Sequence, residues 1–476
     1  MDTLVTNGTL LTMRGERLGI VDSGAVGVDD GRIRYVGPES DAPDPSDADD
    51  VVDAEGGVVM PGLVNAHAHM AHTLLRGGAQ DVPEIEWMNR ALGPLSAHAD
   101  EEDRIAGTRL GVLEAVRGGA TTICEYAGEV GTLVEAVYQP LGVDVVAVET
   151  INEVPDERGD LGPRELYPFD REQGEEALAR ADRLFERFGD DPLVTPAYGP
   201  QALDMVSPEL LGTVQEHAHD RGAKLHLHTA QGEREAIQIE ERYGADESTV
   251  SVLDELGIVD DSLVAVHCHG ATPAERRRLA DGGAAMLGCP SSIAAIDGIV
   301  PPVAEFREYG AAVGIGTDQA PGPGHHSMVR EARTAATLSK VEHTDPTALT
   351  APEALRLATV GGAEALGIDD EVGTLEEGTR ADFLVVDTDR LSTAPAVDSP
   401  LHTAIPNLVY STTGREVRDV FVAGEAIVRD GAFVDADPEA AVADATERAR
   451  ALYERASVDW RAADSELVAA VDDGWL

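Results

Sequence analysis

Four short apolar segments of the sequence carry side chains that commonly bind metal ions. One ends in His67-Ala68-His69, and three others contain or end in His228, His267 and Asp318. Residues two apart on a strand point to the same side, so His67 and His69 can reach one ion together. Imidazoles combined with a carboxylate suit Zn²⁺, Fe²⁺ or a related divalent ion. A lone His-x-His is a weak signal, but the agreement of four segments predicts one divalent metal ion, with Zn²⁺ preferred and Fe²⁺ the alternative.

The chemistry expected of such a group is hydrolysis. A divalent ion makes hydroxide available near neutral pH, because it lowers the pKa of water to ~7 in favourable zinc sites. Hydroxide can attack an electron-poor ring carbon, and ammonia or another leaving group then departs after proton transfer. His226, which lies two residues before His228 and deeper in its strand, is expected to face away from the ion or to support its ligands.

The elements that position these residues repeat along the middle of the chain. Eight apolar runs suited to strands lie at 62–70, 121–126, 144–150, 193–199, 224–230, 263–270, 284–290 and 311–318. Helical periodicity lies between most of them, as over 104–117 and 177–188. Eight β–α units predict an α/β fold, the TIM (β/α)8 barrel, whose active site lies at the carboxyl ends of the strands. A doubly wound sheet is the rival, weakened by the lack of a glycine-rich fingerprint after the first strand.

Both ends of the chain look like short strands and turns rather than β–α units. Strand-like segments lie at 4–11 and 32–37 near the start, and at 382–387 and 417–424 near the end. Because chain termini often lie close together, the two ends are expected to form one small β-sandwich. The expected domains are 1–58 and 371–436 for the two parts of the sandwich, 59–370 for the barrel and 437–476 for an acidic helical tail.

The composition is strongly acidic. The 476 residues include 88 Asp and Glu against 36 Lys and Arg, which gives a formal net charge of −52. Nucleic acid and anionic membranes need basic surfaces and are therefore not expected as partners. The charge favours a surface adapted to high salt, where self-repulsion is screened; an ordinary acidic protein is the alternative. The three cysteines form no disulfide framework, and a cytoplasmic location is expected. The oligomeric state is left open, and a homo-oligomer is possible.

Several motifs resemble the amidohydrolase superfamily. The clearest is Pro61-Gly62-Leu63-Val64-Asn65-Ala66-His67-Ala68-His69, and others lie at 73–77, 107–111, 118–122, 361–367 and 373–382. The likeness covers nearly the whole chain apart from the acidic tail. Within the superfamily, the sequence is most similar to the branch of methylthioadenosine/S-adenosylhomocysteine deaminases, guanine and cytosine deaminases, and triazine hydrolases.

The resemblance implies a role for each candidate residue. His67, His69, His228 and Asp318 would hold one divalent ion. His267 would orient the attacking water and the developing tetrahedral centre, or add a ligand. Asp318 would also accept the proton of that water.

Two departures from the family pattern fall in the expected substrate pocket. Related deaminases carry a proton-shuttling glutamate where this chain has Gln231, and adenosine-type enzymes carry a histidine where it has Gln201. A glutamine can form hydrogen bonds but cannot exchange a proton at neutral pH, so adenosine-type deamination is expected to be slow. Glu233 or Glu235 could take over the acid role, but solvated helix charges are the preferred interpretation of both.

The sequence thus predicts a metal-dependent hydrolase that deaminates a small aminated heterocycle of purine, pyrimidine, pterin or triazine type. Trp87 and His326 are further candidates for substrate contact, beside Gln201 and Gln231. Loss of halide or an alkylamine from a triazine-like ring is the alternative reaction. A non-catalytic binding protein of the same fold is the alternative of a different class.

Overall fold

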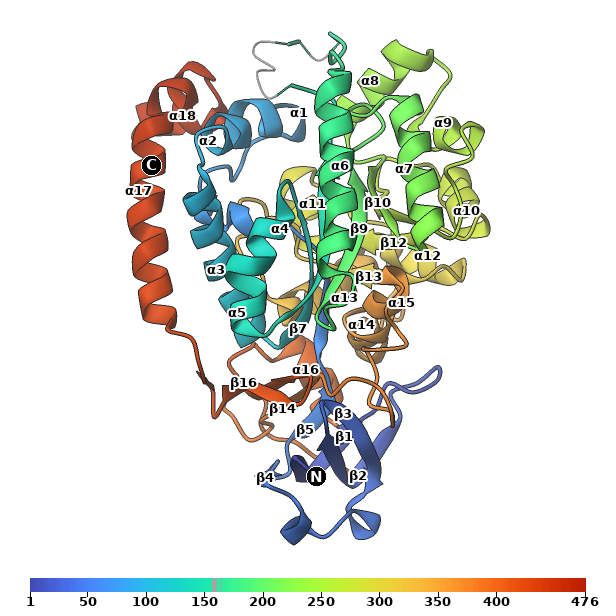
Figure 1. The fold of residues 1–476 in the computed structure, drawn as a ribbon, viewed down its shortest axis with the longest axis vertical. Coiled ribbons are helices and arrows are strands. Elements are labelled where there is room, and N and C mark those ends of the chain that lie inside the picture. Colours follow the sequence, from blue (N-terminus) through green and yellow to red (C-terminus); the bar gives the residue numbers. More distant parts are fainter. Residues whose placement is uncertain (156–160, 163) are drawn as a thin grey trace.

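The computed structural model describes residues 1–155, 161–162 and 164–476, and its centre is a barrel of eight parallel strands (Figure 1). The strands follow one another in chain order around the barrel. They are β6 (Leu63–Ala68), β7 (Ala120–Ala127), β8 (Asp144–Ile151), β9 (Val194–Pro200), β10 (Leu225–Thr229), β11 (Leu263–His267), β12 (Ala285–Gly288) and β13 (Val313–Ile315). All eight predicted runs therefore form strands, and the predicted (β/α)8 barrel is confirmed.

The barrel closes where the first and last strands meet. Ala68 and Asp318 form a parallel bridge, and the backbone N–H of Asp318 donates to the carbonyl oxygen of His67 at 2.9 Å. Gly316 permits this close approach, because a Cβ atom there would lie 2.4 Å from the backbone nitrogen of His67. The closure brings the His67-Ala68-His69 motif beside the segment that carries Asp318.

Alternate residues of the strands pack into two different cores, as the period of two along a strand requires. Val146 and Val266 belong to one buried cluster, whereas their neighbours Val145 and Ala265 belong to the larger cluster shared with the surrounding helices. Because both faces are buried, the strands appear in the sequence as continuous apolar runs.

The helices that cover the barrel fall mostly between the strands. They are α3 (Glu101–Arg117), α4 (Val130–Leu133), α5 (Gln139–Leu141), α6 (Arg171–Phe188), α7 (Pro208–Arg221), α8 (Glu233–Tyr243), α9 (Thr249–Glu255), α10 (Pro273–Asp281), α11 (Pro290–Ile296), α12 (Val303–Glu308), α13 (Met328–His343), α14 (Ala351–Leu357), α15 (Val360–Leu366) and α16 (Ala404–Tyr410). The remaining helical segments are η1 (Glu39–Asp41), η2 (Pro45–Asp47), η3 (Met70–Leu75), α1 (Glu84–Glu86), η4 (Trp87–Leu92), α2 (Gly93–Ser96) and η5 (Val134–Tyr138).

A separate nine-stranded sheet is built from both ends of the chain, as predicted. Its members are β1 (Thr3–Leu11), β2 (Ile20–Asp29), β3 (Arg32–Pro38), β4 (Asp50–Asp53), β5 (Val58–Pro61), β14 (Phe383–Val386), β15 (Val417–Val422), β16 (Glu425–Arg429) and β17 (Ala432–Phe433). The two halves join where β5 pairs antiparallel with β14. The exact limits of the predicted domains stay predictions.

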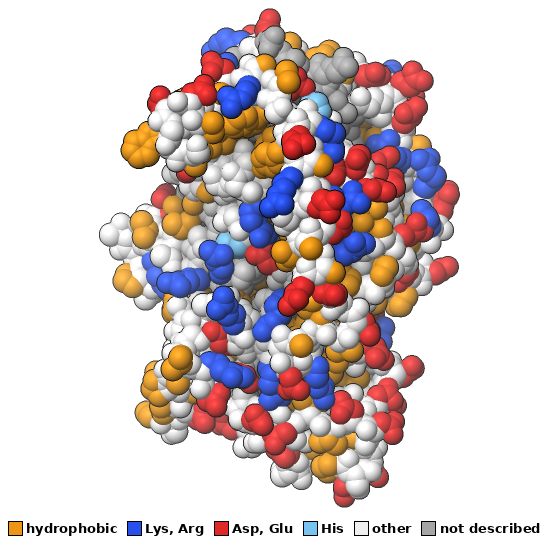
Figure 2. Space-filling view, turned by 90° about the vertical axis from the view of Figure 1, so that its left-hand side faces the viewer, with side chains coloured by type: hydrophobic (Ala, Val, Ile, Leu, Met, Phe, Trp, Pro, Cys, Tyr) orange, Lys and Arg blue, Asp and Glu red, His pale blue; other side chains and the backbone are white. Residues whose placement is uncertain are grey.

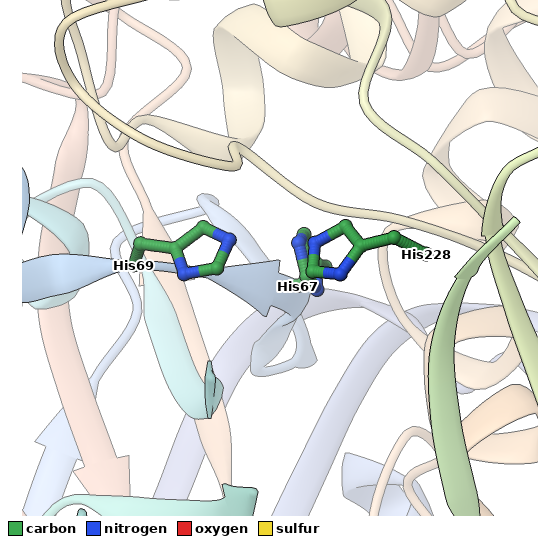
Figure 3. A group of neighbouring side chains, drawn as sticks. All are labelled: His67, His69 and His228. Carbon is green, nitrogen blue, oxygen red and sulfur yellow. The ribbon is translucent and has the colours of Figure 1, made fainter. Parts of the chain in front are cut away.

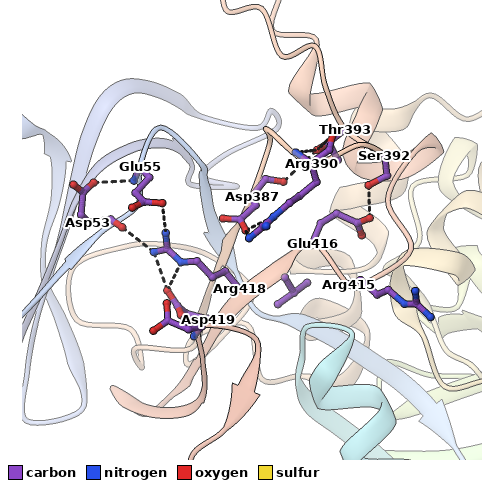
Figure 4. Close-up of polar contacts among 12 residues, drawn as sticks. Asp53, Glu55, Asp387, Arg390, Ser392, Thr393, Arg415, Glu416, Arg418 and Asp419 are labelled. Carbon is purple, nitrogen blue, oxygen red and sulfur yellow. Dashed lines mark hydrogen bonds and ion pairs between the residues drawn. The ribbon is translucent and has the colours of Figure 1, made fainter.

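Ion pairs tie this sheet together and attach it to the barrel. Arg418 of β15 bonds the neighbouring Asp419 at 2.9 Å and reaches Glu55 at 3.7 Å, so that it bridges the two halves (Figure 4). At the barrel, the buried Arg380 pairs with Asp382 and also with Asp144, the first residue of β8.

The C-terminal residues form two helices, α17 (Pro438–Ala462) and α18 (Glu466–Asp472), in agreement with the predicted helical tail. Helix α17 runs from the sheet back along the barrel, beside α3 and α2 (Figure 1). On the face that forms the left-hand side of the molecule in Figure 1, acidic and basic side chains are interspersed (Figure 2). Within the described part of the chain, no helix is long and apolar enough to span a membrane.

Candidate metal centre and substrate cavity

Three histidines meet at the carboxyl ends of the barrel strands. His67 and His69 come from the end of β6, and His228 comes from β10 across the barrel (Figure 3). One ring nitrogen from each lies within 4.8 Å of the others. The ring centroids of His67 and His228 are 5.0 Å apart, and those of His67 and His69 are 4.9 Å apart. The sequence-predicted histidines are therefore brought together at one point.

Backbone carbonyls fix the orientation of two of these rings. The Nδ1 atoms of His69 and His228 bond the carbonyl oxygens of Tyr126 at 2.7 Å and Gln201 at 2.8 Å. This leaves both Nε2 atoms free to bind an ion, the usual arrangement around metal-binding imidazoles. Neither ring nitrogen of the buried His67 has a hydrogen-bond partner among the described residues. A buried polar atom without a partner is costly, and a metal ion would satisfy it.

The same rings are held in the neutral form that metal binding requires. Burial lowers the pKa of His228 to about 4, and burial with the neighbouring imidazoles lowers the pKa of His67 well below its usual value. A neutral imidazole has a lone pair to donate, whereas an imidazolium has none. The donor set thus fits a divalent ion.

Asp318 completes the group on the opposite side of the barrel closure. Its Oδ1 atom lies 3.5 Å from Nε2 of His69 and 3.9 Å from Nε2 of His67. Its other oxygen, Oδ2, accepts a hydrogen bond from the hydroxyl of Ser292 at 2.6 Å. Burial raises the pKa of Asp318 to about 7, against the lowering effect of that hydrogen bond. The backbone of Asp318 has a φ of +57°, a strained conformation of the kind that clusters at functional sites.

His267 lies beside this group, at the end of β11. Its φ is +76°, its ring centroid is 5.3 Å from that of His228, and its Nδ1 atom has no hydrogen-bond partner among the described residues. His226 lies within β10, where its Nδ1 atom contacts the thiol of Cys124 at 3.8 Å, and it is not in the three-histidine group.

A cavity of about 600 Å³ opens onto the group. Its lining includes the sequence-predicted residues His69, His228, His267, Asp318, Gln201 and Gln231. A cavity of this size accommodates a small-molecule substrate.

The loop that carries Gln231 is held from behind by a buried carboxylate. The N–H of Gln231 donates to Glu235 at 2.6 Å, and that of Ala230 donates at 3.3 Å. The hydroxyl of Thr249 also donates to Glu235, at 2.7 Å. Glu233 is exposed, as expected, but the expectation of a solvated Glu235 is wrong: it is 2% exposed, and burial raises its pKa to about 8. Glu235 therefore supports the loop and does not line the cavity.

Two predicted substrate contacts lie elsewhere. Trp87 packs into an apolar cluster, where its indole N–H donates to the carbonyl of Ala79 at 2.8 Å. His326 is fully buried between the hydroxyls of Thr73 and Thr317, at 2.9 and 3.0 Å. Neither is among the described residues that line the cavity, so the lining does not support the predicted contact of Trp87 and His326 with substrate.

The cavity also exposes residues that the sequence did not single out. Glu125, buried at the end of β7, accepts hydrogen bonds from the N–H of Met70 at 3.0 Å and the hydroxyl of Tyr138 at 2.6 Å. His72 stacks on His69 with centroids 5.7 Å apart. A carboxylate within the apolar run 121–126 was the available signal for Glu125; Leu452, another lining residue, had none.

The fold and the site are those of a barrel hydrolase with a candidate metal centre at the carboxyl ends of its strands. The sequence model of the amidohydrolase family matches residues 58–427. The chain belongs to the amidohydrolase family.

Comparison with individual proteins agrees with this family assignment. The chain is 33% identical over 457 residues to a 5'-deoxyadenosine deaminase of Methanosarcina mazei, covering 95% of this chain and 99% of that protein. It is 33% identical over 445 residues to a 5-methylthioadenosine/S-adenosylhomocysteine deaminase of Moorella thermoacetica, covering 94% and 98%. A solved adenosine deaminase from Xanthomonas campestris, with bound zinc, superposes with a TM-score of 0.86 at 31% identity, covering 95% and 99%.

Proposed function

We propose that this chain is a zinc-dependent deaminase that replaces the amino group of a purine-type ring with oxygen and releases ammonia. As an amidohydrolase with deaminase relatives, it acts hydrolytically on carbon–nitrogen bonds. The observation that carries the proposal is the convergence of His67, His69, His228 and Asp318, of which the last three line a substrate-sized cavity. The three cysteines are unpaired, which suits a reducing compartment such as the cytoplasm.

The four converging residues are the proposed ligands. When bound there, a divalent ion would supply hydroxide near neutral pH, since it lowers the pKa of water to ~7 in favourable zinc sites. Zn²⁺ is preferred because imidazoles and one carboxylate form its common ligand set, and the solved relative from Xanthomonas campestris holds zinc.

The protein's own side chains would move the protons and orient the ring. Asp318 accepts the proton of the attacking water on Oδ1, because Ser292 occupies Oδ2. His267, next to His228, donates a hydrogen bond to the oxygen that develops negative charge. Gln201 and Gln231 line the cavity and are proposed to bind the ring by hydrogen bonds. Since an amide exchanges no proton, the ring nitrogen must receive its proton from Asp318, water or a nearby acid.

The relatives point to adenine nucleosides, whereas Gln231 and Gln201 point to a ring recognised by hydrogen bonds alone. The test is ammonia release by the zinc-loaded protein from adenosine, 5'-deoxyadenosine, 5'-methylthioadenosine, guanine, cytosine, pterin and melamine. Zinc-dependent release from a purine-type compound is expected. A protein that holds one zinc ion but releases ammonia from none of these compounds would overturn the proposal. Tight binding without turnover would instead favour the non-catalytic binding protein.

A further inference from the structure

The loop that carries Gln231 is held on a second side by a carboxylate from a distant segment. Glu84 belongs to α1, which lies between β6 and α3 and packs against α8, the helix that follows the loop. Both α1 and α8 lie at the upper end of the molecule in Figure 1. The Oε2 atom of Glu84 accepts a hydrogen bond from the backbone N–H of Glu233 at 3.2 Å. The two residues are 149 positions apart in the sequence, so only the tertiary structure brings them together.

Helix α8 needs an acceptor of this kind at its start. The first N–H groups of a helix have no partner within the helix, and a side chain just before it commonly accepts from them. The residue before α8 is Gly232, which has no such side chain. Glu84 therefore supplies the cap that the local sequence lacks.

The fit between Glu84 and the loop is close. Gly232 has an extended backbone with a φ of 162°, which any residue can adopt, but a Cβ atom there would lie 2.4 Å from Oε1 of Glu84. The two carboxylate oxygens thus contact the loop at two successive residues, Gly232 and Glu233. A side chain at position 232 would displace the carboxylate.

The carboxylate of Glu235 holds the preceding part of the loop. It accepts the N–H groups of Ala230 at 3.3 Å and of Gln231 at 2.6 Å. The backbone of Gln231 is therefore fixed at its own N–H by Glu235 and two residues later by Glu84. Its side chain lines the cavity from this position.

Glu84 is itself held among buried polar groups. Burial and the nearby Asp297 raise the pKa of Glu84 to about 7, against the lowering effect of the N–H groups of Arg234 and Glu233. Asp297 pairs with His269 at 3.2 Å, and both of these side chains are buried. The N-terminus of α8 thus stabilises the ionised form of Glu84, as expected for a carboxylate at the positive end of a helix.

We infer that Glu84 is a positioning residue for Gln231, because it caps α8 and fixes the loop from which Gln231 reaches the cavity. Glu84 acts through the backbone, since it is not among the described residues that line the cavity. The contact of Gln231 with substrate rests on the proposed function, whereas the hold of Glu84 on the loop does not.

Hydrogen exchange measures this hold directly. In the zinc-loaded protein at pH 8, above the pKa of Glu84, the amides of residues 232–236 are expected to exchange at least tenfold faster in Glu84→Ala than in the wild type. Glu84→Gln keeps an acceptor oxygen and is expected to stay within threefold of the wild type. Glu86→Ala is the matched control, because Glu86 lies on the same helix but pairs with Arg90 at 3.2 Å.

Exchange that is unchanged in Glu84→Ala, or raised equally in Glu86→Ala, would overturn the inference. Gly232→Ala tests the same contact from the other side and covers the case in which Glu84→Ala does not fold. Its added methyl group is expected to displace the carboxylate and to raise the exchange rates of the same amides. Unchanged exchange in Gly232→Ala would also count against the contact.

Kinetics test whether the position of the loop matters to the substrate. On the compound with the highest kcat/KM in the ammonia screen, Glu84→Ala and Gly232→Ala are each expected to raise KM at least fivefold, while kcat stays within threefold and the zinc content is unchanged. Glu84→Gln is expected to restore most of the wild-type KM, and Glu86→Ala to leave KM unchanged.

A double-mutant cycle separates positioning from a general loss of stability. In a Gln231→Ala background, Glu84→Ala is expected to raise KM no further, because no amide remains to be positioned. An equal increase of KM with and without Gln231 would overturn the positioning role. Absence of ammonia release in the wild type would overturn the proposed function alone, since the exchange rates still decide whether Glu84 holds the loop.

Discussion

The Nε2 atom of His69 lies 3.5 Å from the Oδ1 atom of Asp318, across the seam where the first and last barrel strands meet. Backbone hydrogen bonds hold the two segments together on both sides, since the N–H of His69 donates to the carbonyl of Asp318 at 3.1 Å. Barrel closure and the candidate metal centre therefore depend on the same residues. Loss of either ligand would leave an imidazole or a carboxylate buried with fewer partners.

Removal of one ligand should remove the metal. His67→Ala and Asp318→Ala are each expected to lose tightly held zinc and to lower kcat at least 10³-fold, because an incomplete site binds the ion weakly. Elemental analysis after gel filtration and ammonia release measure the two effects. His219→Ala is the control, because His219 is half exposed on α7 and pairs with Asp260 at 2.9 Å. A ligand variant with wild-type metal content and rate would show that the metal assignment is wrong.

Metal removal should be reversible. Dialysis against 1,10-phenanthroline is expected to abolish ammonia release, and one equivalent of Zn²⁺ is expected to restore it, because the buried neutral imidazoles are already arranged as donors. Restoration by Fe²⁺ to a higher rate than by Zn²⁺ would favour iron as the ion. Full activity in protein shown to be metal-free would contradict a metal-dependent reaction.

Gln231 should act as a specificity residue. On the compound with the highest kcat/KM in the ammonia screen, Gln231→Ala is expected to raise KM and Gln231→Glu to lower kcat/KM, because a carboxylate cannot reproduce the donor of the amide. Gln231→Glu could instead raise kcat by an amount that approaches the ~10²–10⁴-fold contribution typical of general acid–base catalysis. In that case Gln231 limits the rate rather than selecting the substrate, and an adenosine-type reaction is favoured.

Alkaline pH should destabilise the metal-free protein through Glu331. Burial raises the pKa of Glu331 from 4.5 to about 8, although two hydrogen bonds from Ser291 oppose the rise. The unfolded chain releases this proton at lower pH than the folded one, so the stabilisation present below pH 4.5 is lost as pH rises through about 8, by roughly 5 kcal/mol at most.

Glu331→Gln cannot ionise and is expected to reduce the fall in Tm between pH 5 and pH 9, as followed by circular dichroism. Glu342→Gln, an exposed position on the same helix, is the control. Equal falls in the wild type and Glu331→Gln would count against a protonated buried Glu331.

Salt should stabilise the folded chain. The net charge of −52 produces self-repulsion, and ~1 M salt shortens the Debye length to about 3 Å. The Tm is therefore expected to rise by several degrees between low and molar potassium chloride, as measured by calorimetry. A Tm that stays constant or falls over this range would remove the interpretation of a surface adapted to high salt.

The sequence by itself determined the strands and the metal-ligand candidates. Strands buried on both faces appear as continuous apolar runs, and the polar residues that end them fall at one rim of a parallel barrel. Strand β2, over Ile20–Asp29, was not predicted, because the run is interrupted by Asp22, Ser23 and Gly24 and resembles a turn.

Only the tertiary structure decided which polar side chains are buried and which apolar ones reach the cavity. Glu235 resembles Glu233 in the sequence, yet one lies behind the Gln231 loop and the other in solvent, because burial depends on elements distant along the chain. For the same reason, His326 and Trp87 form hydrogen bonds within the surrounding structure, to Thr73 and to the carbonyl of Ala79. Leu452 lines the cavity because α17 folds back along the barrel, a path set by apolar packing and ion pairs between distant segments rather than by local periodicity.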